Sequence, residues 1–162
     1  KAVKLAKSLL NEFQKRFVDQ WYNMMFNKLG IVNSNKKDRD LVNDLMKLME
    51  EHKADYTQLF IALEKDQTLE QSLFEQEEFK SWTQAWKHRN PDLEQMKKFN
   101  PRIIPRNHWV ENALEAGVDG DMMPFYDLLK LLSNPYDSKP DELLYERTPT
   151  GFDASYQTFC GT

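Results

Sequence analysis

Residues 2–29 read AVKLAKSLLNEFQKRFVDQWYNMMFNKL, and this stretch decides the fold class. Its stripe steps by three and four along Val3, Ala6, Leu10, Phe13, Phe17, Gln20 and Met24, and is widened by Leu9, Trp21 and Met25. That spacing predicts one long helix with a broad apolar face. A packed amphipathic helix is the favoured interpretation, and a coiled coil is the alternative. Gly30 supplies the helix stop, because glycine adopts the left-handed conformation at low cost.

The same periodicity continues along the chain, which contains only 5 Gly among 162 residues. Further helices are predicted from Asp38, over 55–64, from Thr68, from Gln76 to about Asn90, over 92–99, after Asn107, and from Asp121 to Asn134. Thr68-x-x-Gln71 has the form of a capping box. The sequence therefore predicts an all-α domain, with a helical region over residues 1–134.

Three aromatic residues share one stripe of the helix expected after Gln76: Phe79, Trp82 and Trp86. Such a stripe can stack nucleotide bases. The acidic residues within 75–78 would repel phosphates, so burial in the core is the favoured interpretation.

Composition excludes several classes of protein. The formal net charge is −4 and the pI is near 5.4, so a nucleic-acid-binding helical domain is only a third, weaker hypothesis. No apolar run approaches the roughly 18 residues that cross a membrane. The single cysteine, Cys160, excludes an intrachain disulfide. With no export signal, it also favours a reducing compartment.

Motifs for common chemistry are missing from the sequence. No two of His52, His88 and His108 stand at the spacing of a helical metal pair. Asp119-Gly120-Asp121 lacks the rest of a calcium loop and is expected to be a turn. His88-Arg89-Asn90 resembles a kinase catalytic-loop triplet without its aspartate, and we treat it as chance. No catalytic, cofactor-binding or metal-binding residue is predicted here.

Residues 100–108 form the least helical segment, because two prolines hold the backbone extended. Arg102, Arg106 and His108 make a small cationic cluster in or beside it. An anion site is conceivable there. The favoured interpretation is that these side chains tie the loop down through carbonyls and carboxylates such as that of Glu111.

Helix signals fade after Pro135, yet residues 135–162 carry five aromatic rings. Burying such a ring is worth on the order of 1.5–3 kcal/mol, so we expect this irregular tail to lie extended against another surface. Cys160 is third from the end. A cysteine beside a terminus reaches a partner thiol readily unless it is docked.

Two runs carry a family resemblance: Asn100-Pro-Arg-Ile-Ile-Pro-Arg-Asn-His-Trp-Val-Glu111, and Tyr156-Gln-Thr-Phe-Cys-Gly-Thr162. With Ala54-Asp55-Tyr56-Thr57 and Phe79-x-x-Trp82 upstream, they closely resemble the C-terminal part of the selenoprotein O family, the YdiU proteins. The likeness covers essentially the whole chain.

The resemblance implies a protein adenylyltransferase with a protein-kinase-like fold. Such enzymes use ATP and a divalent metal, Mg or Mn, to transfer AMP to protein hydroxyl groups. The family's nucleotide and metal motifs belong upstream and are not found in this sequence. We therefore expect the helical C-terminal segment of that fold, with no cofactor of its own, and the upstream catalytic region and protein substrates as partners.

One residue role transfers through the resemblance. Family members carry a Cys or selenocysteine close to the C-terminus, and Cys160 occupies that place. This implies a redox-regulatory thiol that pairs with a cysteine near the catalytic region. A cytoplasmic location is implied for a bacterial member, and a mitochondrial one for a eukaryotic member. The alternative function is a non-catalytic helical protein-interaction module.

Overall fold

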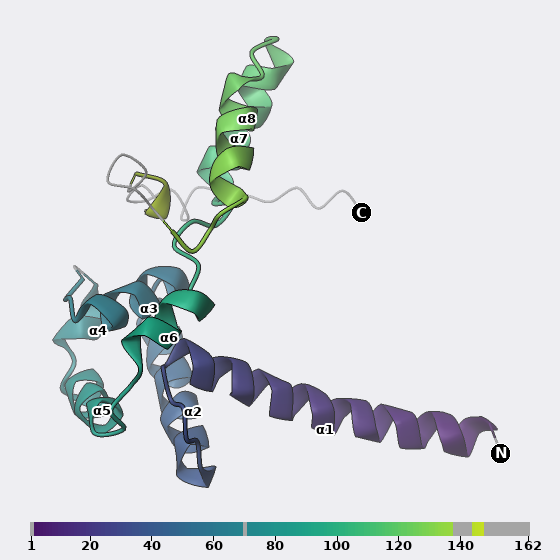
Figure 1. Ribbon diagram of the computed structural model, residues 1–162, viewed down its shortest axis with the longest axis vertical. Helices are drawn as coiled ribbons and strands as arrows, with labels where there is room; N and C mark the ends of the chain where they lie inside the picture. The colour runs from purple at the N-terminus through teal and green to yellow at the C-terminus, as the bar shows by residue number, and fades with distance from the viewer. Residues whose placement is uncertain (1, 70, 138–143, 148–162) are drawn as a thin grey trace. The chain divides into compact units, whose positions relative to one another are not determined.

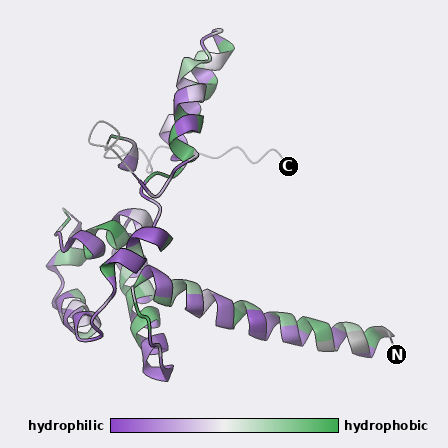
Figure 2. Ribbon diagram, in the orientation of Figure 1, coloured by the Kyte–Doolittle hydropathy of each residue, from purple (hydrophilic) through white to green (hydrophobic). Residues whose placement is uncertain are grey.

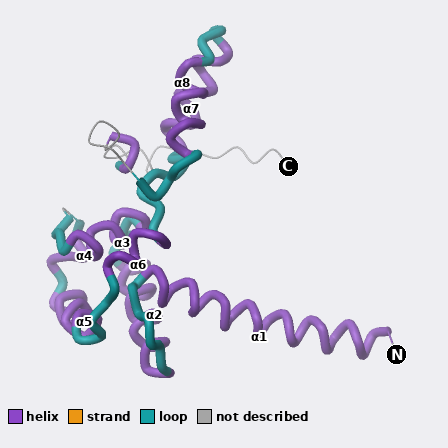
Figure 3. Tube along the Cα trace, viewed as in Figure 1, coloured by secondary structure: helices purple, strands orange, loops and turns teal. Residues whose placement is uncertain are grey.

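The computed structural model describes residues 2–69, 71–137 and 144–147. In these ranges every regular element is a helix and there is no strand (Figure 3). The helices are α1 (Ala2–Lys28), α2 (Lys36–Glu51), α3 (Tyr56–Lys65), α4 (Ser72–Glu75), α5 (Glu77–Lys87), α6 (Leu93–Phe99), α7 (Asn107–Val118) and α8 (Met123–Leu132) (Figure 1). The all-α prediction is confirmed.

The chain divides into two compact units at Asn100 and Pro101, and each is described separately below. The sequence predicted a different division, a helical region over 1–134 and a tail over 135–162. That division stays a prediction, because most of the tail lies outside the described residues.

The first unit, which contains α1–α6, is built around one apolar cluster. The end of α1 packs against α2 and α6, α2 packs against α5, and α3 packs against α6. Fully buried members of the cluster are Met25, Leu29, Val42, Leu45, Leu59, Phe60, Leu73 and Met96, with Trp86 almost so. Phe79, Trp82 and Trp86 are buried here, with stacked rings along α5, so the core interpretation of the aromatic stripe is confirmed.

Polar side chains set the starts of three helices in this unit. Asn35 accepts a hydrogen bond from the backbone of Lys37, and Asp38 accepts one from the backbone of Asn35, which completes a capping box. Asp55 and Asp92 cap α3 and α6 in a similar way. The capping box predicted at Thr68 and Gln71 is wrong. The short helix α4 begins only at Ser72, and Gln71 makes no side-chain cap.

The helix predicted from residues 2–29 is present, but only its last third is packed in the described chain. Residues from Trp21 onward contact the core, whereas Leu10, Phe13 and Phe17 are exposed. Figure 1 shows the first part of α1 running clear of α2–α6, and Figure 2 shows apolar residues along it. The prediction of a helix packed along its length is therefore wrong for this part, because no described element of the unit covers it.

The second unit contains α7 and α8, which pack against each other. The helix predicted from Asp121 begins at Met123, and the prediction is wrong about its cap, because Met122 holds the cap position with no side-chain cap bond. Asp121 lies one residue earlier, and its carboxylate accepts a hydrogen bond from the backbone of Met123 at 2.9 Å. On α8, Leu128 is buried and Leu132 half-buried, but Phe125 and Leu129 are exposed. A hairpin of two helices leaves one face of each without a partner.

Candidate functional site

Cys160, the one site residue that the sequence predicts, lies outside the described residues, as does the rest of the C-terminal motif. Three other places in the described chain gather charged or aromatic side chains. They are the cationic loop of the second unit, the buried cation at the end of α1, and a recess between α3, α4 and α5.

The cationic loop is held by backbone carbonyls. The amides of Arg102 and Ile103 donate to the carbonyl of Pro135, at 2.7 and 3.1 Å. The Arg106 guanidinium Nε donates to the carbonyl of Glu146 at 3.0 Å. These bonds tie the loop to the chain that follows α8, so the structural interpretation is confirmed for Arg106.

Aromatic rings strengthen the same connection. The Trp109 ring lies 4.5 Å from the ring of Tyr145 and 4.9 Å from the ring of His108. His108 is thus part of a cluster of tilted rings within the second unit. The cluster's main observed role is to fix residues 144–147 beside the start of α7.

Arg89, in the kinase-like triplet, has a structural role. Its Nε lies 2.7 Å from Oδ1 of Asp38, and its Nη2 donates to Oδ2 of the same carboxylate at 3.1 Å. Nη2 also donates to the carbonyl of Asn33 at 2.8 Å. Asp38 is buried, so this two-point contact supplies the charge partner that a buried carboxylate needs. The triplet therefore anchors the start of α2.

The last turn of α1 is held by groups from distant parts of the chain. The carbonyl of Lys28 accepts from the side-chain amide of Asn100 at 2.8 Å, and that of Leu29 accepts from the indole of Trp86 at 2.9 Å. The carbonyl of Gly30 accepts from the backbone of Asp92 at 2.9 Å. Helix ends leave carbonyls without intrahelical partners, and here the tertiary structure supplies partners.

The ammonium group of Lys28 is buried at this helix end. It donates to the carbonyl of Phe99 at 3.2 Å and lies 4.9 Å from the ring centre of Phe60 and 5.3 Å from that of Tyr56. Burial lowers the pKa of Lys28 to about 8 and raises the pKa of Tyr56. No sequence pattern pointed to this site, because its members come from α1, α3 and α6.

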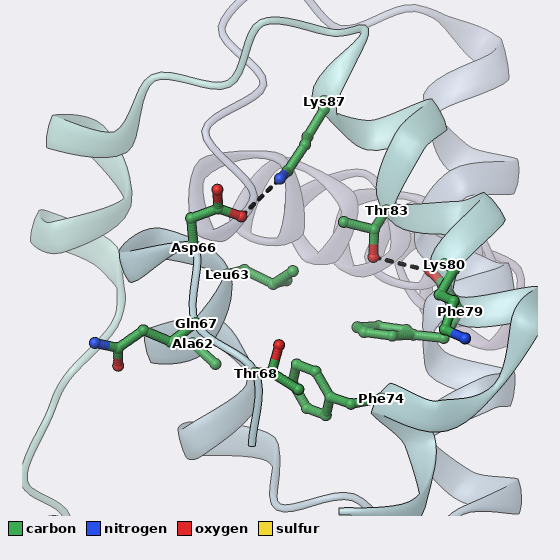
Figure 4. A pocket seen from close by; sticks show the side chains of 10 residues that line it. All are labelled: Ala62, Leu63, Asp66, Gln67, Thr68, Phe74, Phe79, Lys80, Thr83 and Lys87. Atoms are coloured by element: carbon green, nitrogen blue, oxygen red, sulfur yellow. Dashed lines mark hydrogen bonds and ion pairs between the residues drawn. The ribbon is translucent and has the colours of Figure 1, made fainter. Parts of the chain in front are cut away.

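The recess between α3, α4 and α5 has a volume of about 230 Å³ (Figure 4). The rings of Phe74 and Phe79 meet edge to face at 4.9 Å along one side of it. At another side, the Lys87 ammonium lies 2.6 Å from the carboxylate of Asp66, and the hydroxyl of Thr83 donates to the carbonyl of Phe79 at 2.8 Å. Its apolar side and paired charges suit the binding of a small amphipathic group. Sequence reasoning missed it, because three helices contribute its walls.

Two kinds of feature are absent from the described residues. No helix there is long and apolar enough to cross a membrane. Within the same ranges, no group of three or more His, Cys, Asp or Glu side chains is placed to hold a metal ion.

Comparison with known proteins decides the family. The sequence model described as "Protein adenylyltransferase SelO" matches residues 2–133. The chain belongs to the SelO family. It is 40% identical over 171 residues to "Protein nucleotidyltransferase YdiU" of Geobacillus kaustophilus, and 43% identical over 170 residues to the protein of that name from Brevibacillus brevis. These matches cover 100% and 99% of this chain but 35% of each relative, so the chain spans about a third of their length.

The run from Asn100 to Glu111 was one of the two that carried the resemblance to the SelO family. In the structure, its residues hold other segments through hydrogen bonds. Asn100 is buried in the first unit, where it holds the end of α1. Residues 102, 103 and 106 bond to the chain after α8 in the second unit. The SelO-family signature in this chain therefore fixes parts of each unit that are distant in sequence.

Proposed function

We propose that this chain is the C-terminal helical part of a SelO-family protein adenylyltransferase. The whole enzyme transfers AMP from ATP, with Mg or Mn, to hydroxyl side chains of proteins, and acts in the cytoplasm in a bacterial member. In this proposal the segment is supportive and regulatory, and the catalytic residues lie in the part of the protein outside it.

One observation carries the proposal: the relatives match nearly all of this chain but only about a third of their own length. Both relatives are named protein nucleotidyltransferase YdiU. The charged side chains that the sequence singled out support a structural role for the segment. Arg89 is paired with Asp38, and Arg106 holds the carbonyl of Glu146.

The regulatory part of the proposal concerns Cys160. Its thiol would form a disulfide with a cysteine near the catalytic region, with loss of two protons and transfer of two electrons to a cellular thiol oxidant. Reduction would restore both thiols and release the C-terminus. The family position of the residue is the support for this role.

AMP transfer tests the proposal directly. The 162-residue chain and the full-length protein that carries it are incubated with α-labelled ATP, Mn²⁺ and a mixture of bacterial proteins. Label should enter protein only with the full-length form. Incorporation by the 162-residue chain alone would refute the non-catalytic role.

A second experiment tests the thiol. The full-length protein and its Cys160→Ser variant are assayed after oxidation and after reduction. The unaltered protein should change its activity between the two conditions, and the variant should not. Equal behaviour of the two proteins would remove the redox role while leaving AMP transfer intact.

A further inference from the structure

The first two-thirds of α1 exposes a row of large apolar side chains. The α1 stripe is defined here as Val3, Leu10, Phe13 and Phe17, which are 70%, 67%, 67% and 60% exposed. The rings of Phe13 and Phe17 stack at 6.4 Å and form a continuous apolar ridge. A ridge of this size on a regular helix face is typical of a surface that packs against another protein surface.

Packing along α1 ends abruptly at Asp19. From there onward, Asp19 pairs with Arg39 at 2.8 Å, the hydroxyl of Tyr22 donates to Asn43 at 2.9 Å, and Met25 is buried. Before Asp19, the described side-chain contacts of α1 lie within the helix itself, such as that of Arg16 with Glu12. In proteins most helical stability comes from packing of an amphipathic face, and the described unit supplies such packing only to the end of α1.

Charge argues against a second copy of the chain as that covering surface. Between residues 3 and 18, α1 carries four basic residues, Lys4, Lys7, Lys15 and Arg16, and one acidic residue, Glu12. Two such helices side by side would bring like charges together. A groove that is apolar at its floor and acidic at its rim complements the stripe and its flanks.

The length of the relatives indicates which surface covers the α1 stripe. About two-thirds of each curated relative lies outside the match with this chain. We propose that the α1 stripe is the surface on which this remaining part of the protein docks, through an apolar groove with acidic residues along its rim. The inference rests on the proposed function, because it identifies the remaining part as the catalytic region.

Hydrogen exchange tests the proposal without any substitution. Amides of residues 3–18 are compared between the 162-residue chain and the full-length protein, each followed by mass spectrometry. We expect exchange at least about tenfold slower in the full-length protein. Equally fast exchange in both would overturn the proposal.

Substitution gives an independent test with a matched control. Phe13→Asp places a carboxylate on the stripe, and Asn11→Asp places one off the stripe, on the other side of the helix from Phe13. In the full-length protein, Phe13→Asp should abolish the slowed exchange of residues 3–18, and Asn11→Asp should leave it unchanged. In the 162-residue chain, neither should lower the melting temperature of the first unit. Equal effects of the two variants in the full-length protein would contradict docking on the stripe.

Other occupants give different results. If a second copy covers the stripe, sedimentation of the 162-residue chain will show a dimer that Phe13→Asp dissociates. If the chain's own residues 138–162 cover it, their removal from the 162-residue chain will speed exchange in residues 3–18. Either result overturns the proposal. Slow exchange in a full-length protein that transfers no AMP would support docking while refuting the proposed function.

Discussion

The side-chain amide of Asn100 donates to the carbonyl of Lys28 at 2.8 Å, across 72 residues of sequence. The same amide also donates to the carbonyl of Met96 at 2.9 Å, and Asn100 is only 2% exposed. One buried side chain therefore closes the C-terminal ends of both α1 and α6. Asn100 is the last residue of the first unit, and Pro101 begins the second. The two hydrogen bonds of the Asn100 side chain therefore hold the end of the first unit in place.

Asn100→Ala should destabilise the first unit, because it removes the side-chain donor to the carbonyl of Lys28 and one of the two donors to the carbonyl of Met96. The expected loss in free energy of unfolding is about 2 kcal/mol. Urea unfolding followed by tryptophan fluorescence measures it. Asn112→Ala is the control, since Asn112 is exposed on α7 and should change stability by less than about 0.5 kcal/mol. Equal losses for the two variants would contradict a role for the amide in closing the helix ends.

Breaking the contact of Arg89 with Asp38 should lower the free energy of unfolding of the first unit strongly. Arg89→Met leaves a buried carboxylate without its charge partner, with an expected loss of about 3 kcal/mol or more. The exposed pair of Lys80 and Glu77 provides the comparison, and Lys80→Met should cost less than about 1 kcal/mol. A double-mutant cycle with Asp38→Asn checks the assignment, since the two losses should not add. Additive losses would show that Arg89 acts through other contacts.

Stability should rise with pH because of Lys28. Its folded pKa is about 8, below the ordinary value of 10.5, so the unfolded chain binds more protons between these values. The free energy of unfolding should therefore increase from pH 7.5 to 9.5, by on the order of 1–2 kcal/mol. Measurements stop at 9.5, because the raised pKa of Tyr56 gives the opposite sign once pH passes 10.

Lys28→Met should remove this dependence and raise stability near pH 7, since it places an apolar side chain in the buried position. Lys36→Met, at an exposed position, serves as the control and should keep the slope of the unaltered chain. Urea unfolding at four pH values is sufficient. A slope that survives Lys28→Met would assign the effect to other groups.

Three glycines should respond differently to alanine. At Gly30, with φ +67°, a Cβ would lie 2.6 Å from the carbonyl oxygen of Asp92, so Gly30→Ala should cost more than about 2 kcal/mol. Gly120, with φ +90°, has open space around it, so only backbone strain of about 1 kcal/mol is expected. Gly117 lies inside α7 with only an ordinary contact nearby, and Gly117→Ala should stabilise that helix by about 0.5–1 kcal/mol.

Thermal unfolding and hydrogen exchange of the peptides around each glycine measure this series. The expected order of stability is Gly117→Ala, then Gly120→Ala, then Gly30→Ala. A Gly30→Ala variant no weaker than Gly120→Ala would contradict the close approach of Asp92 to the end of α1.

Helix positions were largely predictable from the sequence, because they depend on neighbours three and four residues away. The stripe of residues 2–29, the stop at Gly30 and the helix starts at Asp55 and Asp92 all use such local signals. The helix start predicted at Thr68 was wrong because it also relied only on neighbouring residues. Its residues fit a capping box, but the chain there does not enter a helix until Ser72.

The candidate sites were not predictable in this way. In the sequence, Arg89 belonged to a chance likeness to a kinase catalytic-loop triplet, and Arg106 belonged to a cationic cluster that could either bind an anion or tie the loop down. Only their partners, Asp38 and the carbonyl of Glu146, decided between the interpretations. Lys28 carried no signal at all, since its aromatic neighbours follow it by 28 and 32 residues.

The sequence by itself determined that this protein is helical and, through its motifs, to which family it belongs. Helical periodicity and short motifs are written in residues close together along the chain. Only the tertiary structure decided that Asn100 closes α1, that Lys28 is buried among aromatic rings, and that the α1 stripe stays uncovered by the rest of the first unit. Burial depends on which distant segments of the chain pack together. A local sequence pattern shows that a helix face is apolar, but it does not show which segment covers that face.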